Sequence, residues 1–484
     1  MQSSTEVSAP GKPKTACAFA CAVVAACLIV KLGVLLLDDR VRLFMGDSAT
    51  YLWSAVGLHI PPDRSFTYPL LIRLTAGASG SITTLLWVQS LCGVATSVMV
   101  CGLLRRSFAL RAWIAAVAAL LVALDPSQLF YERMVMTESV STCVLVASLC
   151  AAFAYLRRRQ LRYLVLCILF GVMLASLRVG LVPFALALGP AAVLLASRTG
   201  SLRASVRPLL LAVIATWACH SAYQHVYGRI THSHPGYIRD GGFFRLGLVA
   251  PLVTSASFEG TGLDGSLLDD VKIPLGDPHL REAQIWQPGG LIDVLKRRGG
   301  PRAYRIAAQL ASNAIGNDPV GVVRLGLQTL REYFNANYYR ARLASDLGSD
   351  RVPDANTIEL LRTHFNYDVT GVAQTPSPVY RYFENTSAWL VCCLFSLVPL
   401  SILVIAACRR RCAREGVLLG LVGTGLVVGQ ILCSHIISFR YLHPFPVIEI
   451  MCLGIIVNAV VAARYGQPQS TRAQPALRVS LQTS

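Results

Sequence analysis

A short stretch after the first apolar segment carries the residue types best suited to chemistry. Asp47 lies in residues 46–51 (GDSATY), and Arg64 and Tyr68 follow within residues 64–69 (RSFTYP). A carboxylate can take a proton from an attacking hydroxyl or amine, or bind a divalent cation. A guanidinium can hold a phosphate through two hydrogen bonds, and a tyrosine ring can pack on an apolar chain or a sugar. We therefore predict Asp47 as a catalytic base and Arg64 and Tyr68 as substrate-binding residues.

Each of these residues also has a structural interpretation, which the sequence leaves open. Asp47 could cap the helix that starts near it, because a carboxylate can accept from free backbone N–H groups. Arg64 and Tyr68 could anchor the chain at the membrane surface, where both residue types are enriched.

Further ionisable residues stand where the chain enters or leaves apolar segments. Those that we predict to bind substrate are Glu132, Glu138, Arg178, Arg440 and Tyr441. Charges at membrane depth are costly, so they tend to be functional or paired, and a structural pair of Glu138 with Arg178 or Arg133 is the alternative. For the arginines, headgroup contact is the alternative. No residue is predicted as a metal ligand and no cofactor is certain, although a divalent cation at Asp47 stays open.

Composition places these residues in a membrane protein. Of 484 residues, 54% are hydrophobic and only 14% are charged, and the mean hydropathy is +0.53. Soluble domains average about 25% charged residues. The net charge of +18 does not indicate a nucleic-acid partner, because residues 228–385 hold 17 basic against 16 acidic side chains. The excess positive charge lies around the apolar segments instead, as the positive-inside rule predicts.

The fold class predicted is all-α, a polytopic membrane helix bundle of about ten transmembrane helices. The spans are expected at residues 16–37, 82–104, 112–124, 134–156, 163–177, 179–196, 208–226, 388–407, 417–433 and 442–463. Lys31 inside the first span is expected to reach the interface or an acidic partner. Residues 46–57 have helical character and are too polar to span, so amphipathic helices should lie at the membrane surface.

The charge of alternate loops predicts the topology. Arginine clusters follow the second, fourth, sixth and eighth spans, which places both termini in the cytoplasm. Four regions are predicted: a catalytic membrane half (1–227) with a first outer loop (38–81), an extracytoplasmic region (228–385), C-terminal spans (386–463) and a disordered cytoplasmic tail (464–484). Apolar residues at helical spacing predict helices at 303–314 and 320–335 within the mostly helical extracytoplasmic region.

Taken together, the motifs resemble the GT-C superfamily of polyprenyl-phosphate-sugar-dependent membrane glycosyltransferases. This superfamily includes protein O-mannosyltransferases, aminoarabinose transferases and RgtA/B/C/D-like bacterial proteins. The resemblance rests on GDSATY, RSFTYPLL, LDPSQLFYERMVMTES, SLRVG and SFRYLHPFP, in that order. It implies that Asp47 is the catalytic base, and that the later acidic and basic outer residues of the family correspond to Glu138, Arg178 and Arg440.

The resemblance also implies partners and a location. The donor would be a polyprenyl-phosphate-linked sugar, the acceptor a lipid, glycan or protein, and membrane lipids would surround the site. The protein would be a multi-pass protein of the bacterial inner (plasma) membrane, with residues 228–385 in the periplasm. The alternatives are a lipid or solute transporter or flippase, which would show membrane-depth charges and an inverted repeat, and a non-catalytic envelope assembly protein.

Overall fold

The computed structural model describes residues 13–44, 46–197, 202–349, 352–369, 376–409 and 412–465. Within these ranges the chain is helical, and its backbone pairing outside helices includes one isolated β-bridge, Arg42 with Met134. The predicted all-α class is confirmed. The tail predicted to be disordered lies outside the described residues, apart from Arg464 and Tyr465, which end the last helix.

The membrane bundle is built from long apolar helices. They are α1 (Pro13–Leu37), α4 (Thr83–Ser107), α5 (Ala112–Leu124), α7 (Glu138–Arg158), α8 (Leu161–Leu177), α9 (Val182–Ala196), α10 (Leu202–Ile230), α19 (Ala388–Cys408), α20 (Ala413–Cys433) and α22 (Phe445–Tyr465). Among the described residues, seven helices are long and apolar enough to cross a membrane, whereas α5 and α8 are shorter and α10 is not one of the seven. The protein is thus multi-pass, but the count of about ten spans is not confirmed.

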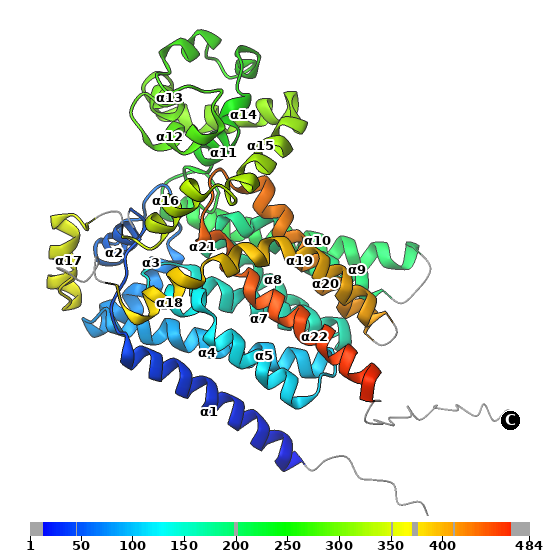
Figure 1. Cartoon of the computed structure of the whole chain (residues 1–484). Coiled ribbons are helices and arrows are strands. Elements are labelled where there is room, and N and C mark those ends of the chain that lie inside the picture. The colour runs from blue at the N-terminus through cyan, green and yellow to red at the C-terminus, as the bar shows by residue number, and fades with distance from the viewer. Residues whose placement is uncertain are drawn as a thin grey trace, which may run out of the picture.

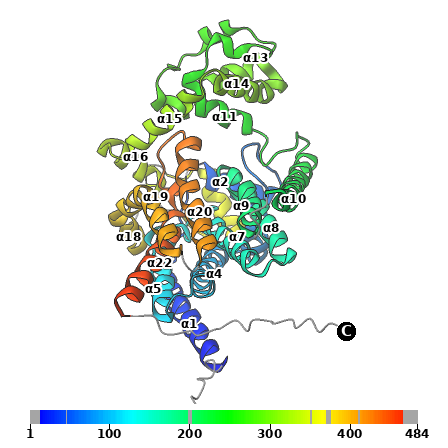
Figure 2. The same ribbon diagram turned by 90° about the vertical axis from the view of Figure 1, so that its right-hand side faces the viewer.

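Helix α7 lies at the centre of the bundle. It packs against α4, α8 and α9, while α1 covers α4 and α5 on the outside. The last helices form a second group, in which α19 packs on α20 and α22, and α22 packs on α5 (Figures 1 and 2). Arg157 and Arg158 in the last turn of α7 favour the helix because cations complement its negative C-terminal end.

Short helices join the spans at the end of the bundle where the site lies. They are α2 (Asp47–Gly57), α3 (Thr67–Ile72), the π-helical turn η1 (Arg73–Gly77), α6 (Pro126–Tyr131), the 3-10 turn η2 (Val179–Leu181) and α21 (Phe439–Leu442). Asp125 caps α6 by accepting from the N–H of Gln128, and Pro126 pre-sets the first helical turn. The predicted surface helix at residues 46–57 is α2.

The predicted extracytoplasmic region divides into two parts. The first part, which we call the cap, holds α11 (Gly241–Val249), α12 (Arg281–Trp286), α13 (Leu291–Gly299) and α14 (Ala303–Asn317) around a hydrophobic core of its own. The second part contains α15 (Pro319–Glu332), α16 (Ala336–Asp346), α17 (Ala355–Phe365) and α18 (Pro378–Thr386), and its buried residues join the core of the bundle. The cap stands beyond one end of the bundle, and α15 and α16 lead back from it (Figure 1). Both helices predicted in this region, at 303–314 and 320–335, are present.

Candidate functional site

Helix α2 brings Asp47 into the site at its first residue. Gly46 takes the N-cap position with φ 84°, a conformation that favours glycine. The hydroxyl of Thr50 donates back to the Gly46 carbonyl at 2.7 Å, and Ser48 donates to the Val135 carbonyl at 2.9 Å. Because Gly46 holds the cap position, the Asp47 carboxylate projects from the start of the helix instead of closing it.

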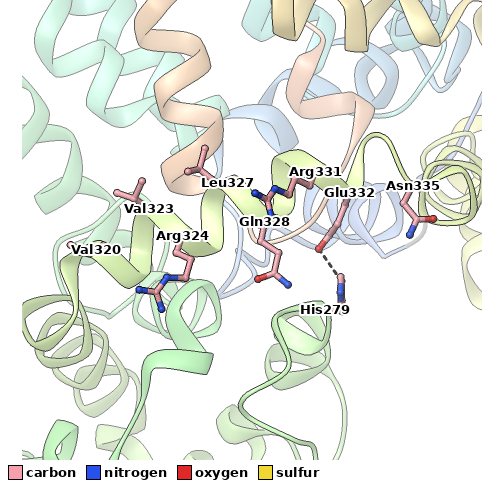
Figure 3. Close-up of a pocket in the computed structure, with 9 residues that line it drawn as sticks. All are labelled: His279, Val320, Val323, Arg324, Leu327, Gln328, Arg331, Glu332 and Asn335. Atoms are coloured by element: carbon pink, nitrogen blue, oxygen red, sulfur yellow. Dashed lines mark ion pairs between the residues drawn. The ribbon is translucent and has the colours of Figure 1, made fainter.

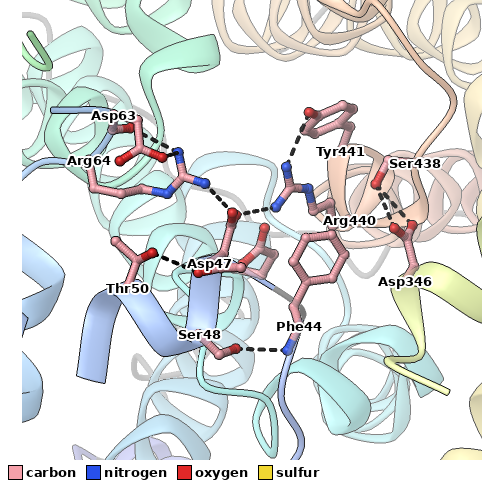
Figure 4. A network of polar contacts seen from close by, with 12 residues as sticks. Phe44, Asp47, Ser48, Thr50, Asp63, Arg64, Asp346, Ser438, Arg440 and Tyr441 are labelled. Atoms are coloured by element: carbon pink, nitrogen blue, oxygen red, sulfur yellow. Dashed lines mark hydrogen bonds and ion pairs between the residues drawn. The ribbon is translucent and has the colours of Figure 1, made fainter. Parts of the chain in front are cut away.

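Two guanidinium groups share the Asp47 carboxylate (Figure 4). Arg64 pairs with Oδ1, and Arg440 pairs with Oδ2 at 2.6 Å. The Asp47 side chain is 13% exposed, and the two arginines are 16% and 17% exposed. Burial raises the pKa of Asp47, but the two arginines outweigh it and hold the pKa below its ordinary value of 3.8. Asp47 is therefore a carboxylate in this structure, with both oxygens engaged.

Aromatic rings and a second carboxylate fix the arginines. The guanidinium of Arg440 lies over the Phe44 ring at 4.5 Å, and it donates to the Tyr441 hydroxyl at 3.3 Å. Arg64 also pairs with Asp63 at 3.2 Å. Stacking of this kind keeps a guanidinium plane in a fixed orientation while its edge stays free to bind an anion.

Glu138 and Arg178 are two further predicted site residues. Their side chains form an ion pair at 4.0 Å, and Glu138 is 3% exposed. Burial raises the pKa of Tyr51, and the charges of Arg64, Asp47 and Glu138 act on it next. The guanidinium of Arg64 lies over the Tyr51 ring at 5.9 Å. The pairing that we considered as the alternative for Glu138 is thus present, next to the Asp47 ion pairs.

Several buried N–H groups in this cluster have no hydrogen-bond partner within the described part of the chain. They are Nε of Arg64, Nε of Arg440 and Nη1 of Arg178. Unpartnered buried donors are costly, and three of them on three arginines make a region that would favour an anion with several oxygens.

Two predicted site residues lie apart from this cluster. Glu132 is fully buried and pairs with Lys31 at 2.6 Å, so the acidic partner expected for Lys31 is present. Tyr68 is 1% exposed, and its hydroxyl donates to Gln89 at 2.8 Å. The Tyr68 ring meets the Tyr51 ring edge-on at 4.9 Å. The substrate-binding roles predicted for Tyr68 and Glu132 both stay predictions.

A separate groove of about 690 Å³ lies along α15 (Figure 3). None of Asp47, Arg64 and Arg440 lines it. Its lining residues are His279, Val320, Val323, Arg324, Leu327, Gln328, Arg331, Glu332 and Asn335. The helix crosses the end of α20, because a Cβ at Gly326 would lie 2.1 Å from the Ile431 carbonyl oxygen. The groove is therefore a second surface, distinct from the Asp47 cluster.

Metal binding has little support from side-chain grouping. Across the ranges that the structure describes, no three His, Cys, Asp or Glu side chains are grouped to hold a metal ion. The two Asp47 oxygens that could bind a cation face guanidinium groups instead.

Comparison with known proteins supports the resemblance found in the motifs. Residues 63–223 match a family model described as dolichyl-phosphate-mannose-protein mannosyltransferase. This stretch includes Arg64, Glu138 and Arg178 but neither Asp47 nor Arg440. The chain is a multi-pass helical membrane protein, and the family match shows that residues 63–223 are similar to this mannosyltransferase family.

Other comparisons add less. No curated protein matches the chain. A solved structure, ArnT from Cupriavidus metallidurans bound to undecaprenyl phosphate, is 17% identical, covers 87% of this chain and 77% of its own, and has a TM-score of 0.32. At that TM-score the likeness carries no argument about the site.

Proposed function

We propose that the protein is a membrane glycosyltransferase that moves a sugar from a polyprenyl-phosphate donor to a lipid, glycan or protein acceptor. The reaction would take place at the outer face of the bacterial inner membrane, with both termini in the cytoplasm. The observation that carries the proposal is the meeting of Asp47 with Arg64 and Arg440, which come from the two ends of the chain. The mannosyltransferase family match supports the class of donor.

The chemistry is a single displacement at the anomeric carbon. An acceptor hydroxyl or amine attacks, and Asp47 takes its proton as the new bond forms. The bond between the anomeric carbon and the phosphate oxygen breaks, and the polyprenyl phosphate leaves with the electron pair. The charge that grows on the leaving phosphate is stabilised by the guanidinium groups of Arg64 and Arg440, with Arg178 nearby. One displacement inverts the configuration of the sugar.

The ion pairs of Asp47 with Arg64 and Arg440 must weaken before Asp47 can act as a base. A carboxylate whose two oxygens are held by arginines has a low pKa and is a poor base. The donor phosphate would compete for the same guanidinium groups and draw them from Asp47. Burial, which raises the pKa, would then dominate, and Asp47 would become the stronger base that the reaction needs.

The position of the charges favours an enzyme over a transporter. A transporter is expected to hold its charged residues near the middle of the membrane. Asp47 and Arg64 lie outside the candidate spans, and Arg440 lies at the start of the last one. A non-catalytic assembly protein would not need Asp47 to be a base, so the substitution below separates that alternative.

The proposal is tested by comparing cell-envelope glycans from three strains: the wild type, a deletion strain and an Asp47→Asn strain. We expect the deletion strain and the Asp47→Asn strain to lack the same glycan or glycolipid. If the deletion removes a glycan that Asp47→Asn retains, Asp47 is not the base. If the deletion changes no glycan or glycolipid, the protein is not a transferase of this class.

A further inference from the structure

The C-terminal end of α16 touches both loops that build the candidate site. One loop carries Phe44 and leads into α2, whose first residue is Asp47, and the other carries Ser438 and leads into α21, which carries Arg440. Asp346 is the last residue of α16 and is only 3% exposed. It lies beside Arg440 at the edge of the ion-pair network (Figure 4).

Asp346 holds the turn that presents Arg440. Its carboxylate accepts from the Ser438 hydroxyl at 2.9 and 3.1 Å and from the backbone N–H of Phe439. Tyr333, the residue that follows α15, holds the same turn. Its hydroxyl donates to the Ser438 carbonyl and accepts from the Ser438 N–H, both at 3.2 Å. The backbone immediately before Arg440 is thus fixed by side chains that come from the region after the cap.

Gly348 brings the other loop to the same place. It has φ 68°, and a Cβ there would lie 2.2 Å from the backbone oxygen of Leu43. Only glycine allows so close an approach at a positive φ. Leu43 adjoins Phe44, whose ring lies against Arg440. Residues 346–348 therefore contact both loops. The Asp346 carboxylate contacts the loop at Ser438, and the backbone of Gly348 contacts the loop at Leu43.

We propose that Asp346 is a positioning residue that holds Arg440 in place for the phosphate of the donor. This inference rests on the proposed function. Asp346 touches neither Asp47 nor the guanidinium of Arg440 by hydrogen bond; it acts through Ser438 and Phe439. The second part of the extracytoplasmic region is then a component of the donor site, which it completes by fixing one arginine.

The test uses the full-length protein in lipid nanodiscs and three variants. Asp346→Ala removes the acceptor, whereas Asp346→Asn keeps an oxygen that can accept from Ser438 and Phe439. Asp270→Asn is the matched control, because Asp270 pairs with Arg298 on the exposed surface of the cap. The measurements are backbone amide exchange over residues 438–442 and binding of undecaprenyl phosphate as the probe.

We expect Asp346→Ala to speed amide exchange at residues 438–442 and to weaken binding of the probe by about tenfold, the effect of losing a hydrogen bond to a charged group. Asp346→Asn should retain most of both properties, and Asp270→Asn should retain all of them.

Three outcomes would overturn the inference: unchanged exchange in Asp346→Ala, faster exchange throughout the bundle, or an equal loss in Asp346→Asn. Failure of the proposed function is a different result, in which the wild type does not bind the probe although exchange still responds locally to Asp346→Ala. In that case Asp346 fixes the turn without serving a donor site.

Discussion

Two of the ion-pair centres in the described part of the chain differ in their access to solvent. At the first, Asp47 lies between Arg64 and Arg440 and is 13% exposed. At the second, Glu132 and Lys31 pair at 2.6 Å and both side chains are 0% exposed. The first centre is accessible to solvent and the second is sealed from it. The comparison therefore predicts different effects for substitutions at two groups of charges that look alike in the sequence.

The surroundings of the sealed centre reinforce the difference. Gln128 donates to Glu132 Oε1 at 3.0 Å, and Gln89 donates to the Glu132 carbonyl at 3.0 Å. A Cβ at Gly93 would lie 1.9 Å from the same carboxylate oxygen, so α4 has no side chain at this point. Neutral donors and a close helix thus surround the Glu132 carboxylate.

The largest effect is expected for Asp47→Asn. Removing a general base lowers turnover by about 10²–10⁴-fold. The thermal unfolding midpoint should also fall, because Arg64 and Arg440 lose the carboxylate that they share, so turnover is compared per folded molecule. Asp63→Asn is the matched control, since Asp63 also pairs with Arg64 but makes no contact with Arg440, and its turnover should stay near that of the wild type. Turnover of Asp47→Asn above half the wild-type value would show that the accessible centre is not catalytic.

For Lys31→Met, we expect a large loss of stability instead of a loss of turnover. It leaves the Glu132 carboxylate buried without a cation, which costs about 3–5 kcal/mol of unfolding free energy. Thermal unfolding in detergent should show the loss, while turnover per folded molecule should be retained. The double variant Lys31→Met with Glu132→Gln should recover most of the stability, because no charge is then left unpaired. Loss of turnover in a stable double variant would place Glu132 in the reaction.

Arg440→Lys should have a smaller effect. Lysine keeps the charge but cannot offer a planar pair of donors or stack on Phe44 in the same way. We expect kcat/KM for the donor to fall by about tenfold, as for loss of one charge-assisted hydrogen bond, because Arg440 both holds the phosphate and stabilises the charge that grows on it. An unchanged kcat/KM would contradict a role for Arg440 at the donor phosphate.

The pH dependence should differ between the free enzyme and the donor complex. The pKa of Asp47 is depressed in the free enzyme, so the carboxylate and its stabilising ion pairs persist above pH 3.8 and are lost only as pH falls below that value. The profile of kcat/KM should show no acid limb from Asp47 above about pH 4, whereas the profile of kcat should show one at higher pH. Coincident acid limbs would mean that the donor does not draw the arginines away.

Tyr68→Phe should have the smallest effect. It removes the hydrogen bond to Gln89 and should lower the unfolding free energy by about 1 kcal/mol. Thermal unfolding measures the loss, and Tyr51→Phe serves for comparison at the ring that faces Arg64. A rise in the donor KM for Tyr68→Phe would support the substrate-binding role that the sequence predicts for Tyr68.

Much of the fold could be predicted because apolar length and arginine placement are local properties of a sequence. They indicated the helices of the bundle, the surface helix α2 and the helices α14 and α15. The number of spans could not be settled in this way, since short helices such as α5 and α8 depend on their neighbours for burial. The division of residues 228–385 into a cap and a bundle-packed part depends on long-range packing that periodicity does not encode.

The charged residues of the candidate site could be predicted from the sequence, but the residues that hold them in place could not. Asp47, Arg64 and Arg440 are charged residues beside apolar spans, which is a visible pattern. Asp346 and Tyr333 are ordinary residues in a polar region, and only the fold brings them to Ser438. Glu132 and Glu138 look alike in the sequence, and only the structure shows that one meets a lysine inside the bundle and the other meets Arg178 next to the site.

The contact between Asp47 and Arg440 joins residues 393 positions apart in the chain. During synthesis, a chain that has emerged only as far as α10 carries Asp47 and Arg64 but lacks the second arginine. The site is complete only once α20 and α22 are in place, so a nascent or truncated chain cannot assemble it. Under the proposed function, a chain that ends before α21 would lack one of the two arginines that hold the donor phosphate.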